Sequence, residues 1–347
     1  MTPCITQRPL RVVAIGGGTG LSTLLRGLKH YTRPAAGANN SAQDRPTCIS
    51  QLTAVVTVTD DGGSSGRLRR DLGILPPGDV RNCITALSDY ESLLSRLFQF
   101  RFPEAEDGAE SGLAGHSFGN LFLAALTHIT GDFSQAVQMS SQVLAARGQI
   151  FPATNTDVRL SAVMNDGSLV EGETNITASH KIIRELHMHP PDAPPMQQTL
   201  QAIEQADLIT MGPGSLYTSL ITNLLVPGIP EAIAASRATR VYICNIMTQA
   251  NESLGLSASE HLRCIQQHAK TNIFDYALVN NAHLSEDLVS RYASEGQMPI
   301  VADLDRVRDL GVEPVPGNYV WEGKVLRHDY DRMATALLEL GAKGRPA

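Results

Sequence analysis

A cluster of glycines follows the first apolar stretch of the chain, Val12 to Ile15. Glycine lets the backbone approach an anion without a Cβ in the way, and the first N–H groups of a helix have no partner inside it. Leucines at helical spacing come next, so the pattern predicts a strand, a phosphate-binding turn and a helix. A tight turn without a ligand is the alternative. The candidate ligand-binding residues of this glycine turn are Gly16, Gly17, Gly18, Thr19 and Gly20.

The glycine turn is an imperfect match to the dinucleotide fingerprint. Leu21 stands where that pattern has its third glycine or alanine. The run is not a Walker A loop either. A nucleotide-like ligand therefore fits the turn, but a dinucleotide is only one candidate.

A second polar loop, here called the acidic loop, follows the apolar stretch Leu52 to Thr59. Ligands of open α/β sheets bind at the carboxyl edge of the strands, where this loop is expected to lie. Its acids could accept from a sugar hydroxyl or hold magnesium, its hydroxyls and amides could donate to phosphate, and its arginine could add a charged fork. A solvated turn whose acids cap the next helix is the alternative. The candidates are Asp60, Asp61, Gly62, Gly63, Ser64, Ser65 and Arg67.

A proline turn, Leu75 to Gly78, precedes the next expected helix. Asp79 fits the N-cap of that helix, because a carboxylate there accepts from free N–H groups. Arg81 and Asn82 then fall in the first turn, where their side chains can reach a ligand on the helix end.

The segment Gly115 to Gly119 fits the GxSxG pattern of serine hydrolases. That elbow needs a buried strand before it, whereas the preceding residues are acidic and loop-like, so the hydrolase interpretation is set aside. Ser117 is instead expected to cap an apolar helix. His116 and Asn120 become candidate ligand contacts at the start of that helix, with a structural role for His116 as the alternative.

A third strand-to-turn pattern occurs late in the chain, where a glycine-proline turn follows Leu208 to Met211. Such a turn in the second half of a doubly wound sheet would face the first across the switch point, and the two would form a crevice. An ordinary tight turn is the alternative. The candidate residues are Gly212, Gly214, Ser215 and Leu216.

The bulk properties of the chain limit the possible partners and locations. It has 347 residues, 42% of them hydrophobic, and a formal charge of -7. That charge argues against binding nucleic acid by phosphate neutralisation. The start of the chain has no signal-peptide pattern and no apolar run reaches about 18 residues, so we expect a cytoplasmic protein without membrane insertion.

The elements expected to position these residues alternate between strands and helices. Strands are predicted at 11–15, 52–59, 208–211, 241–246 and 274–279. The rhythm predicts an α/β fold with a Rossmann-like, doubly wound, mostly parallel sheet and helices on both faces. A mostly helical subdomain is expected at about 67–150, a hairpin at about 158–173 and a proline-rich loop at 187–195. One domain would span 10–335 and leave a loose tail at 336–347.

Five ordered blocks of sequence resemble the gluconeogenesis factor (YvcK-like) family, within the CofD-like superfamily of 2-phospho-L-lactate transferase. The blocks are VVAIGGGTGLSTLLRGLK, VTVTDDGGSSGRLR, PPGDVRNCITAL, GHSFGNLFLAAL and GPGSLYTSL. The resemblance implies a cytosolic, Rossmann-like protein that binds UDP-sugars such as UDP-N-acetylglucosamine and is linked to cell shape and carbon metabolism. The transferase relatives use magnesium, an acidic loop corresponding to Asp60 or Asp61, and an arginine corresponding to Arg81.

One loop departs from the family pattern. After Met247 to Gln249 a glycine-glutamate-threonine run is expected, whereas this chain has Asn251, Glu252 and Ser253. The part played by this loop in the site is therefore an open question at the level of sequence.

Two functions remain open on this evidence. The favoured hypothesis is a regulatory protein that binds a UDP-sugar, with a dinucleotide as the second candidate ligand and with a homo-oligomeric state expected. The alternative is a magnesium-dependent transferase acting on a phosphorylated or nucleotide-activated donor, with Asp60, Asp61, Arg81 and His116 as its candidate catalytic residues.

Overall fold

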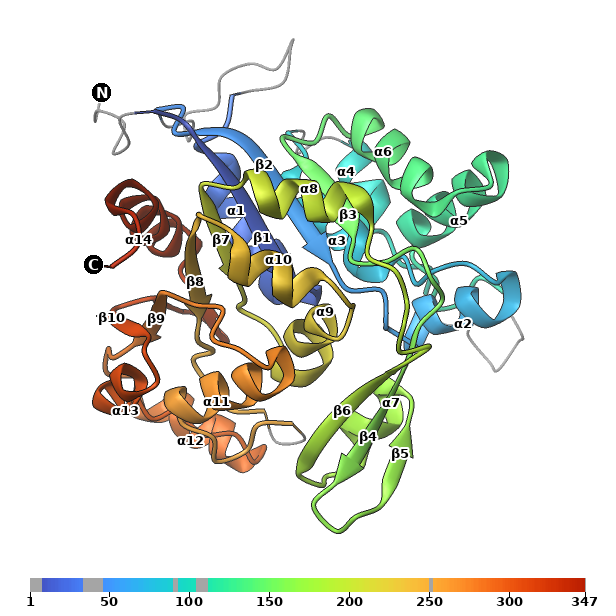
Figure 1. Ribbon diagram of the computed structural model, residues 1–347. Coiled ribbons are helices and arrows are strands. Elements are labelled where there is room, and N and C mark those ends of the chain that lie inside the picture. Colours follow the sequence, from blue (N-terminus) through green and yellow to red (C-terminus); the bar gives the residue numbers. More distant parts are fainter. Residues whose placement is uncertain (1–7, 34–45, 90–92, 104–111, 250–251, 347) are drawn as a thin grey trace.

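A seven-stranded parallel sheet forms the centre of the protein in a computed structural model that describes residues 8–33, 46–89, 93–103, 112–249 and 252–346. The strand order is β10-β9-β8-β7-β1-β2-β3. The strands are β1 (Leu10–Gly16), β2 (Ile49–Val56), β3 (Gln149–Pro152), β7 (Leu208–Met211), β8 (Thr239–Ile243), β9 (Tyr276–Asn280) and β10 (Glu313–Gly317). The predicted α/β class with a doubly wound parallel sheet is confirmed (Figure 1).

The strand order reverses between β1 and β7, which pair in parallel register from Val12 and Leu208 to Ile15 and Met211. From β1 the chain proceeds to β2 and β3 on one side, and from β7 to β8, β9 and β10 on the other. The carboxyl ends of β1 and β7 therefore form the topological switch point, where ligands of such sheets bind.

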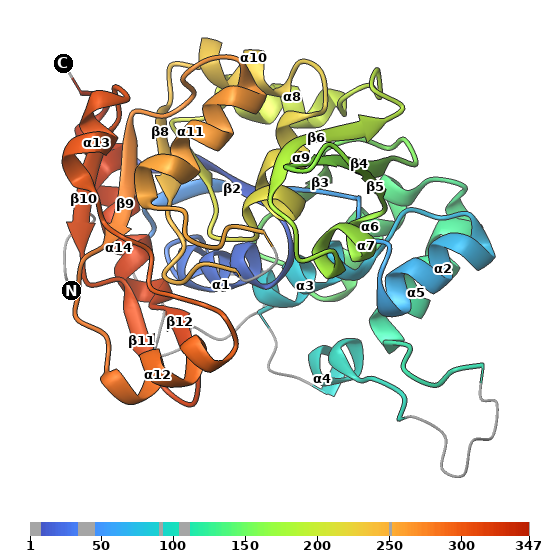
Figure 2. The same ribbon diagram turned by 90° about the horizontal axis from the view of Figure 1, so that it is seen from below.

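Helices cover both faces of the sheet (Figure 2). One face carries α1 (Gly18–Lys29), α3 (Gly78–Leu87) and α14 (Tyr330–Lys343), and the other carries α8 (Gln197–Gln205), α10 (Ile229–Ala235) and α11 (Ala258–Ala269). The leucines that follow the glycine turn are buried in α1, as their helical spacing predicts.

The segment between β2 and β3 contains five helices among its described residues. They are α2 (Gly63–Leu72), α3, α4 (Leu93–Gln99), α5 (Phe118–Thr130) and α6 (Phe133–Val143). The predicted helical region thus fills the connection between two neighbouring strands, and it brings α2, α3 and α5 to the carboxyl edge of the sheet.

The sequence analysis missed β3 and β10, which contain Pro152 and Pro314 and Pro316. Proline has no N–H to donate to a neighbouring strand, so a sequence pattern that contains proline does not favour a strand. Both strands lie at the edges of the sheet, where only one side is paired and proline is tolerated.

A small antiparallel sheet lies beside the main one, with the order β5-β4-β6. The predicted hairpin corresponds to β4 (Arg159–Met164) and β5 (Leu169–Glu171), and α7 (Glu173–Ala178) follows it. The prediction of a loop at 187–195 was wrong at its start, because β6 (Ile183–His189) pairs with β4 there. The histidine at 189 donates to or accepts from the Ser161 hydroxyl across this pair.

The chain ends in a buried helix, so the expected loose tail at 336–347 was wrong for residues up to Lys343. The helix α14 buries Met333, Leu337 and Leu340 against the core, at the spacing of one helix face. It follows α12 (Glu286–Ser294), α13 (Leu304–Asp309) and the hairpin β11 (Val320–Glu322) and β12 (Leu326–His328).

A π-helical segment, η2 (Leu216–Ile221), and the short α9 (Thr222–Leu224) follow β7. In the described part of the chain no single helix is long and apolar enough to cross a membrane. One pair, Leu216–Leu224 with Ile229–Ala235, reaches that length and composition only when joined across a bend of 77°.

Candidate functional site

The glycine turn joins β1 to α1, as the sequence predicts. Gly17 is the N-cap of α1 in an extended conformation, and Gly18 has a φ of +59°, a left-handed value that favours glycine. Gly20 has a different reason to be glycine. A Cβ there would lie 2.1 Å from the carbonyl oxygen of Pro213, so the glycine turn packs directly on the glycine-proline turn.

The glycine-proline turn is held by a side chain from the end of β8. Gly212 has a φ of +91° and precedes a cis proline. The amide N–H of Gly214 donates to Asn245 Oδ1 at 3.1 Å, and Asn245 Nδ2 donates to the Gly214 carbonyl at 2.8 Å. This reciprocal pair fixes the turn at the switch point, beside the glycine turn.

A cavity of about 450 Å³, here called the switch-point cavity, opens where the two turns meet. The β11–β12 hairpin and α12 with the residues after it supply its other walls. Its lining residues are Gly17, Gly18, Thr19, Gly20, Pro213, Gly214, Ser215, Ser219, Asn245, Ile246, Met247, Gln249, Tyr292, Gln297, Leu326, Arg327 and His328.

The switch-point cavity has a single strong cation among its described lining residues, Arg327 on β12. His328 also lines it, but burial lowers its pKa to about 4, so this ring is neutral at physiological pH. Its Nε2 lies 3.1 Å from the Cys244 carbonyl. Of the candidates from the two turns, Gly16, Gly212 and Leu216 are not among the described lining residues.

Glu252 contacts the start of η2, directly after the glycine-proline turn. The sequence analysis did not recognise it as a site residue. Its carboxylate accepts from the Thr218 hydroxyl at 2.7 Å and from the Tyr217 N–H at 3.2 Å, at the start of η2. Burial raises the pKa of Glu252. Glu252 thus holds the start of η2 through two hydrogen bonds, whereas Asn251 of the same run lies outside the described residues.

Two further hydrogen bonds stabilise the loop that contains Gln249 and Glu252. Gln249 Nε2 donates to Ser215 Oγ at 2.8 Å, and the Gln249 N–H donates to Ser253 Oγ at 3.1 Å. The loop after β8 thus positions one wall of the switch-point cavity through hydrogen bonds to its neighbours.

Asp61 has a structural role that the sequence analysis did not foresee. Its carboxylate accepts from the N–H groups of Glu173 and Thr174 at 2.8 and 2.9 Å, and from the Thr174 hydroxyl at 2.6 Å. These contacts cap α7, a helix more than 100 positions later in the chain. The acid does cap a helix, but not the one that follows it.

Asp79 lies against the glycine turn and is not the N-cap of α3. Pro77 occupies the cap position, and Asp79 falls in the first turn. Its carboxyl accepts from the Gly18 N–H, and loss of solvent around it, followed by repulsion from Asp60, raises its pKa to about 7. A Cβ on Gly17 would lie 2.8 Å from Asp79 Oδ2. An internal carboxyl therefore touches the helix start that was predicted to bind phosphate.

Asp79 is one of three neighbouring carboxyls at the ends of β1 and β2. Asp60 accepts from the Gly62 N–H at 2.9 Å through Oδ1. Glu173 accepts from the Thr59 hydroxyl at 3.2 Å, and burial, followed by repulsion from Asp60 and Asp79, raises its pKa. The sequence analysis missed Glu173, because nothing in a strand-to-helix pattern connects α7 with the acidic loop.

A polar network joins three other candidates from separate segments. Ser64 Oγ lies 3.0 Å from His116 Nδ1 and accepts from Asn120 Nδ2 at 3.1 Å. Burial, then the Arg67 charge, lowers the pKa of His116. Arg67 itself donates to the Ala114 carbonyl at 2.7 Å. These contacts hold α2 and α5 together beside the acidic loop.

Arg81 and Asn82 extend this network along α3. Arg81 donates to the Ser117 hydroxyl and, at 2.7 Å, to Asn82 Oδ1. Ser117 is the N-cap residue of α5 and forms an isolated bridge with Arg101. Residues 112–116, directly before it, contain no strand, so the structure agrees with setting the hydrolase elbow aside.

The predicted site residues thus form two groups. The two glycine-containing turns line the switch-point cavity, whereas the acidic loop and the starts of α3 and α5 form a polar network beside it. Ser65 lies in the second group, buried against α3, where a Cβ on Gly78 would come within 2.5 Å of its hydroxyl. Asp79 connects the groups through Gly18.

Comparison with known proteins finds a matching family model and similar proteins. The model of the family described as 2-phospho-L-lactate transferase CofD matches residues 12–320. The gluconeogenesis factor of Halalkalibacterium halodurans is 47% identical over 329 residues, which are 94% of this chain and 95% of that protein. The gluconeogenesis factor of Bacillus subtilis is 43% identical over 335 residues, covering 96% and 98%.

A solved structure has the same fold. The crystal structure of a UPF0052 family member from Bacillus halodurans superposes with a TM-score of 0.87 and 45% sequence identity, over 96% of this chain and 100% of that chain. The sequence blocks, the sheet topology and the relatives therefore all agree on the same family.

Proposed function

The chain belongs to the gluconeogenesis factor family within the CofD-like superfamily, and from that premise we propose that it is a regulatory protein that binds a nucleotide sugar. The ligand proposed is a UDP-sugar such as UDP-N-acetylglucosamine, bound in the cytoplasm. The proposal includes the control of carbon metabolism and cell shape as the processes that respond to ligand binding, and a homo-oligomeric protein.

The observation that carries the proposal is the switch-point cavity. Its volume of about 450 Å³ lies in the range of small-molecule sites, and the turns after β1 and β7 both line it. Apart from the Gly18 N–H, which donates to Asp79, the start of α1 offers backbone donors and the positive end of a helix dipole to a diphosphate. Arg327, which lines the same cavity, supplies a charge-assisted donor for this group.

The other lining groups suit the uncharged ends of such a ligand. Thr19, Gln249 and Gln297 present hydroxyl and amide groups to the cavity, and Tyr292 presents a ring. Amides and hydroxyls donate to and accept from both sugar hydroxyls and the edge of a base. A nucleotide sugar combines all three chemistries: a diphosphate, a polyhydroxyl ring and a planar base.

Thermal shifts with a panel of nucleotides test this proposal. At about 100 times its dissociation constant, a ligand adds roughly 2.7 kcal/mol to the free energy of unfolding. We expect UDP-N-acetylglucosamine to raise the melting temperature, and to do so more than UMP or NAD. Failure of every nucleotide, sugar nucleotide and dinucleotide in the panel to shift melting would refute binding at this site.

A matched pair of variants on the β11–β12 hairpin localises the binding. Arg327→Ala removes the cation that lines the cavity and is expected to weaken binding about tenfold, the loss typical of a charge-assisted contact. Lys324→Ala removes the same charge from the exposed tip of the hairpin, outside the lining, and serves as control. Equal losses in both variants would mean that the ligand responds to general charge and not to this cavity.

A magnesium-dependent transferase is the second candidate, favoured by the three carboxyls Asp60, Asp79 and Glu173 beside the cavity. Asp61 does not fit as a magnesium ligand, because its two oxygens already accept hydrogen bonds at the start of α7. Within the described residues, however, no three histidine, cysteine or acidic side chains are arranged to hold a metal, so the three carboxyls do not form a complete magnesium site. Of the two acids predicted from sequence as magnesium ligands, Asp60 is left, and no step is assigned to a metal.

Product analysis separates the two functions. The protein is incubated with Mg²⁺, a UDP-sugar and candidate acceptor hydroxyl compounds, and mass spectrometry follows the release of UDP or UMP. Turnover by the natural chain that is lost in Asp60→Asn, with ligand binding retained, would establish the transferase. Ligand binding without turnover is expected for the regulatory protein.

A further inference from the structure

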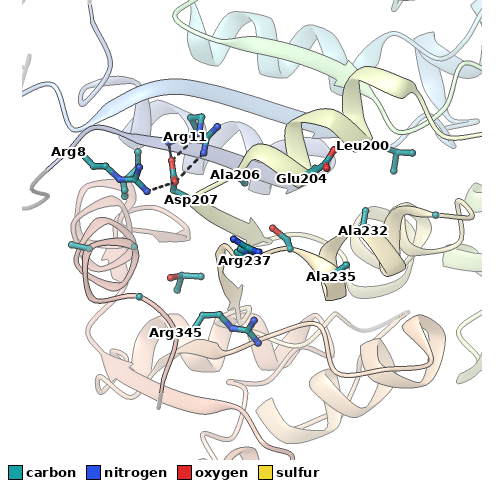
Figure 3. A pocket seen from close by; sticks show the side chains of 17 residues that line it. Arg8, Arg11, Leu200, Glu204, Ala206, Asp207, Ala232, Ala235, Arg237 and Arg345 are labelled. Atoms are coloured by element: carbon teal, nitrogen blue, oxygen red, sulfur yellow. Dashed lines mark hydrogen bonds and ion pairs between the residues drawn. The ribbon is translucent and has the colours of Figure 1, made fainter.

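A second, large cavity lies at the amino edge of the sheet, opposite the edge that carries the two turns; Figure 3 shows its lining. Its volume is about 1350 Å³, and it opens where β1, β7 and β8 begin. The C-terminal ends of α8, α10 and α14 surround it. We call it the amino-edge cavity, and no candidate site residue discussed above lines it.

Arginines from three separate parts of the chain line the amino-edge cavity (Figure 3). Arg8 and Arg11 share the Asp207 carboxylate, at 3.0 and 3.2 Å. Both arginines remain partly exposed, at 77% and 43% of their side chains, whereas Asp207 is exposed at only 13%. One partly buried carboxylate therefore holds two guanidinium groups at the wall of the cavity, and one positive charge stays uncompensated.

The same arrangement occurs at the far side of the cavity. Asp275, 6% exposed, pairs with Arg240 at 2.6 Å and with Arg345 at 3.1 Å. Arg345 lines the cavity, and Arg240 lies buried behind it and also reaches the Ala234 carbonyl at the end of α10. A second carboxylate is thus shared by two guanidinium groups, with the outer one at the cavity.

Arg237 adds a cation for which the described part of the chain shows no carboxylate partner. Four arginines and two carboxylates, Glu204 and Asp207, line the cavity, which is a surplus of two positive charges. The whole chain carries a formal charge of -7, so this surplus is local. Asp275 and the Ala234 carbonyl at the end of α10 compensate the charge of Arg240, whereas Arg237 is exposed and lines the cavity.

The remaining lining residues are small or apolar. Alanines and glycines of α10 and α14, together with Leu10 and Leu200, leave space between the arginine groups. The cavity therefore combines an apolar wall with separated cations. A single inorganic ion would use one guanidinium group and leave most of this space unfilled.

From this arrangement we propose that the amino-edge cavity binds an organic anion with two or more negative charges, the chemical class of nucleoside di- and triphosphates. The anionic end lies among Arg8, Arg237 and Arg345, and one face of the nucleoside packs on the alanines. Arginine forks recognise phosphate oxygens in pairs, so two or three of them define a polyphosphate. The site is separate from the switch-point cavity and does not depend on the function proposed for it.

Calorimetric titration of the full chain with ADP tests the proposal. ADP binding is expected at about 50 mM salt and weaker at 0.5 M, because the arginines are partly exposed and salt screens them. Arg237→Ala is expected to weaken ADP binding about tenfold with an unchanged melting temperature, since this side chain makes no hydrogen bond to the part of the chain that the structure describes. Arg184→Ala, an exposed arginine on β6, is the matched control and leaves binding unchanged.

The switch-point variant Arg327→Ala distinguishes the two cavities, since ADP could also enter the first. Retained ADP binding in Arg327→Ala together with loss in Arg237→Ala supports the amino-edge site. Loss in Arg327→Ala alone assigns the nucleotide to the switch-point cavity and overturns the proposal. Absence of ADP binding by the natural chain, or tighter binding of an acidic hexapeptide than of ADP through Arg237, also overturns it.

Discussion

Glycine at position 20 is explained in one way by the sequence and in another by the structure. The sequence favours glycine there for approach to a phosphate, whereas the structure uses the missing Cβ to let two turns touch. The contact between the Gly20 backbone and the Pro213 carbonyl brings β1 and β7 loops together and forms the floor of the switch-point cavity.

Gly20→Ala is therefore expected to disturb both stability and binding. The new methyl group would lie 2.1 Å from a backbone oxygen, which cannot rotate away as a side chain can. We expect a loss of about 1–3 kcal/mol in the free energy of unfolding, the usual cost of overpacking, measured by urea denaturation. Gly112→Ala is the control, because a Cβ there meets no atom of the described residues within 4 Å. An unchanged stability in Gly20→Ala would contradict the direct contact of the turns.

Asp79 makes the protein sensitive to pH at the start of α1. Its pKa is raised from 3.8 to about 7 in the folded chain, so the unfolded chain ionises first as the pH rises. The free energy of unfolding consequently falls between about pH 4 and pH 7 through this group. Asp79→Asn keeps an acceptor for the Gly18 N–H but cannot ionise.

We expect Asp79→Asn to flatten this pH dependence. As the pH rises from 5 to 8, the free energy of unfolding of the variant increases relative to that of the natural chain by about 1 kcal/mol or more. Urea denaturation at several pH values gives the measurement. A constant difference between the two proteins across this range would show that Asp79 ionises normally in the fold.

At the scale of elements, α7 depends on a carboxylate far away in sequence. Asp61→Ala removes the acceptor of the Glu173 and Thr174 N–H groups, and the loss of such a cap costs about 1 kcal/mol of stability. Binding of a nucleotide sugar is expected to survive, as Asp61 does not line the cavity. Asp61→Asn, which keeps an acceptor oxygen, is the milder control. Loss of ligand binding with unchanged stability would restore Asp61 to the ligand site.

The turns and helices near the site were predictable because their signals are local. Glycine clusters, a proline turn and apolar spacing each occupy a few consecutive residues, and α1, α3 and α5 begin within a few residues of the expected positions. The roles of Asp61, Asp79 and Glu252 were not predictable in this way. Each accepts from a backbone N–H on a different element, and no spacing within one segment encodes such a partner.

At the scale of the whole molecule, the C-terminal helix belongs to the core. Leu337, Leu338 and Leu340 of α14 are buried, and α14 lies so close to α1 that a Cβ on Gly27 would come within 2.3 Å of the Tyr330 carbonyl oxygen. The last turns of the chain therefore close one face of the sheet.

Deleting residues 336–347 tests this role. The loss of three buried leucines is expected to reduce the free energy of unfolding by about 5 kcal/mol, and the truncated chain will melt early or fail to fold. Deleting only 346–347, beyond the helix and the Arg345 ion pair, is the control for the loss of terminal residues. Full stability of the longer deletion would mean that α14 is dispensable.

The sequence by itself determined the class of fold, the strand-to-helix turns and the family, because these follow from local periodicity, backbone preferences and ordered blocks of residues. The tertiary structure decided which of the polar residues share a cavity. Folding places Arg327 and Asn245 in the same cavity as the glycine turn. It also makes Asp61 the cap of α7 and brings arginines from both ends of the chain to the opposite edge of the sheet. Such contacts depend on how distant segments pack against one another, and local sequence patterns therefore do not predict them.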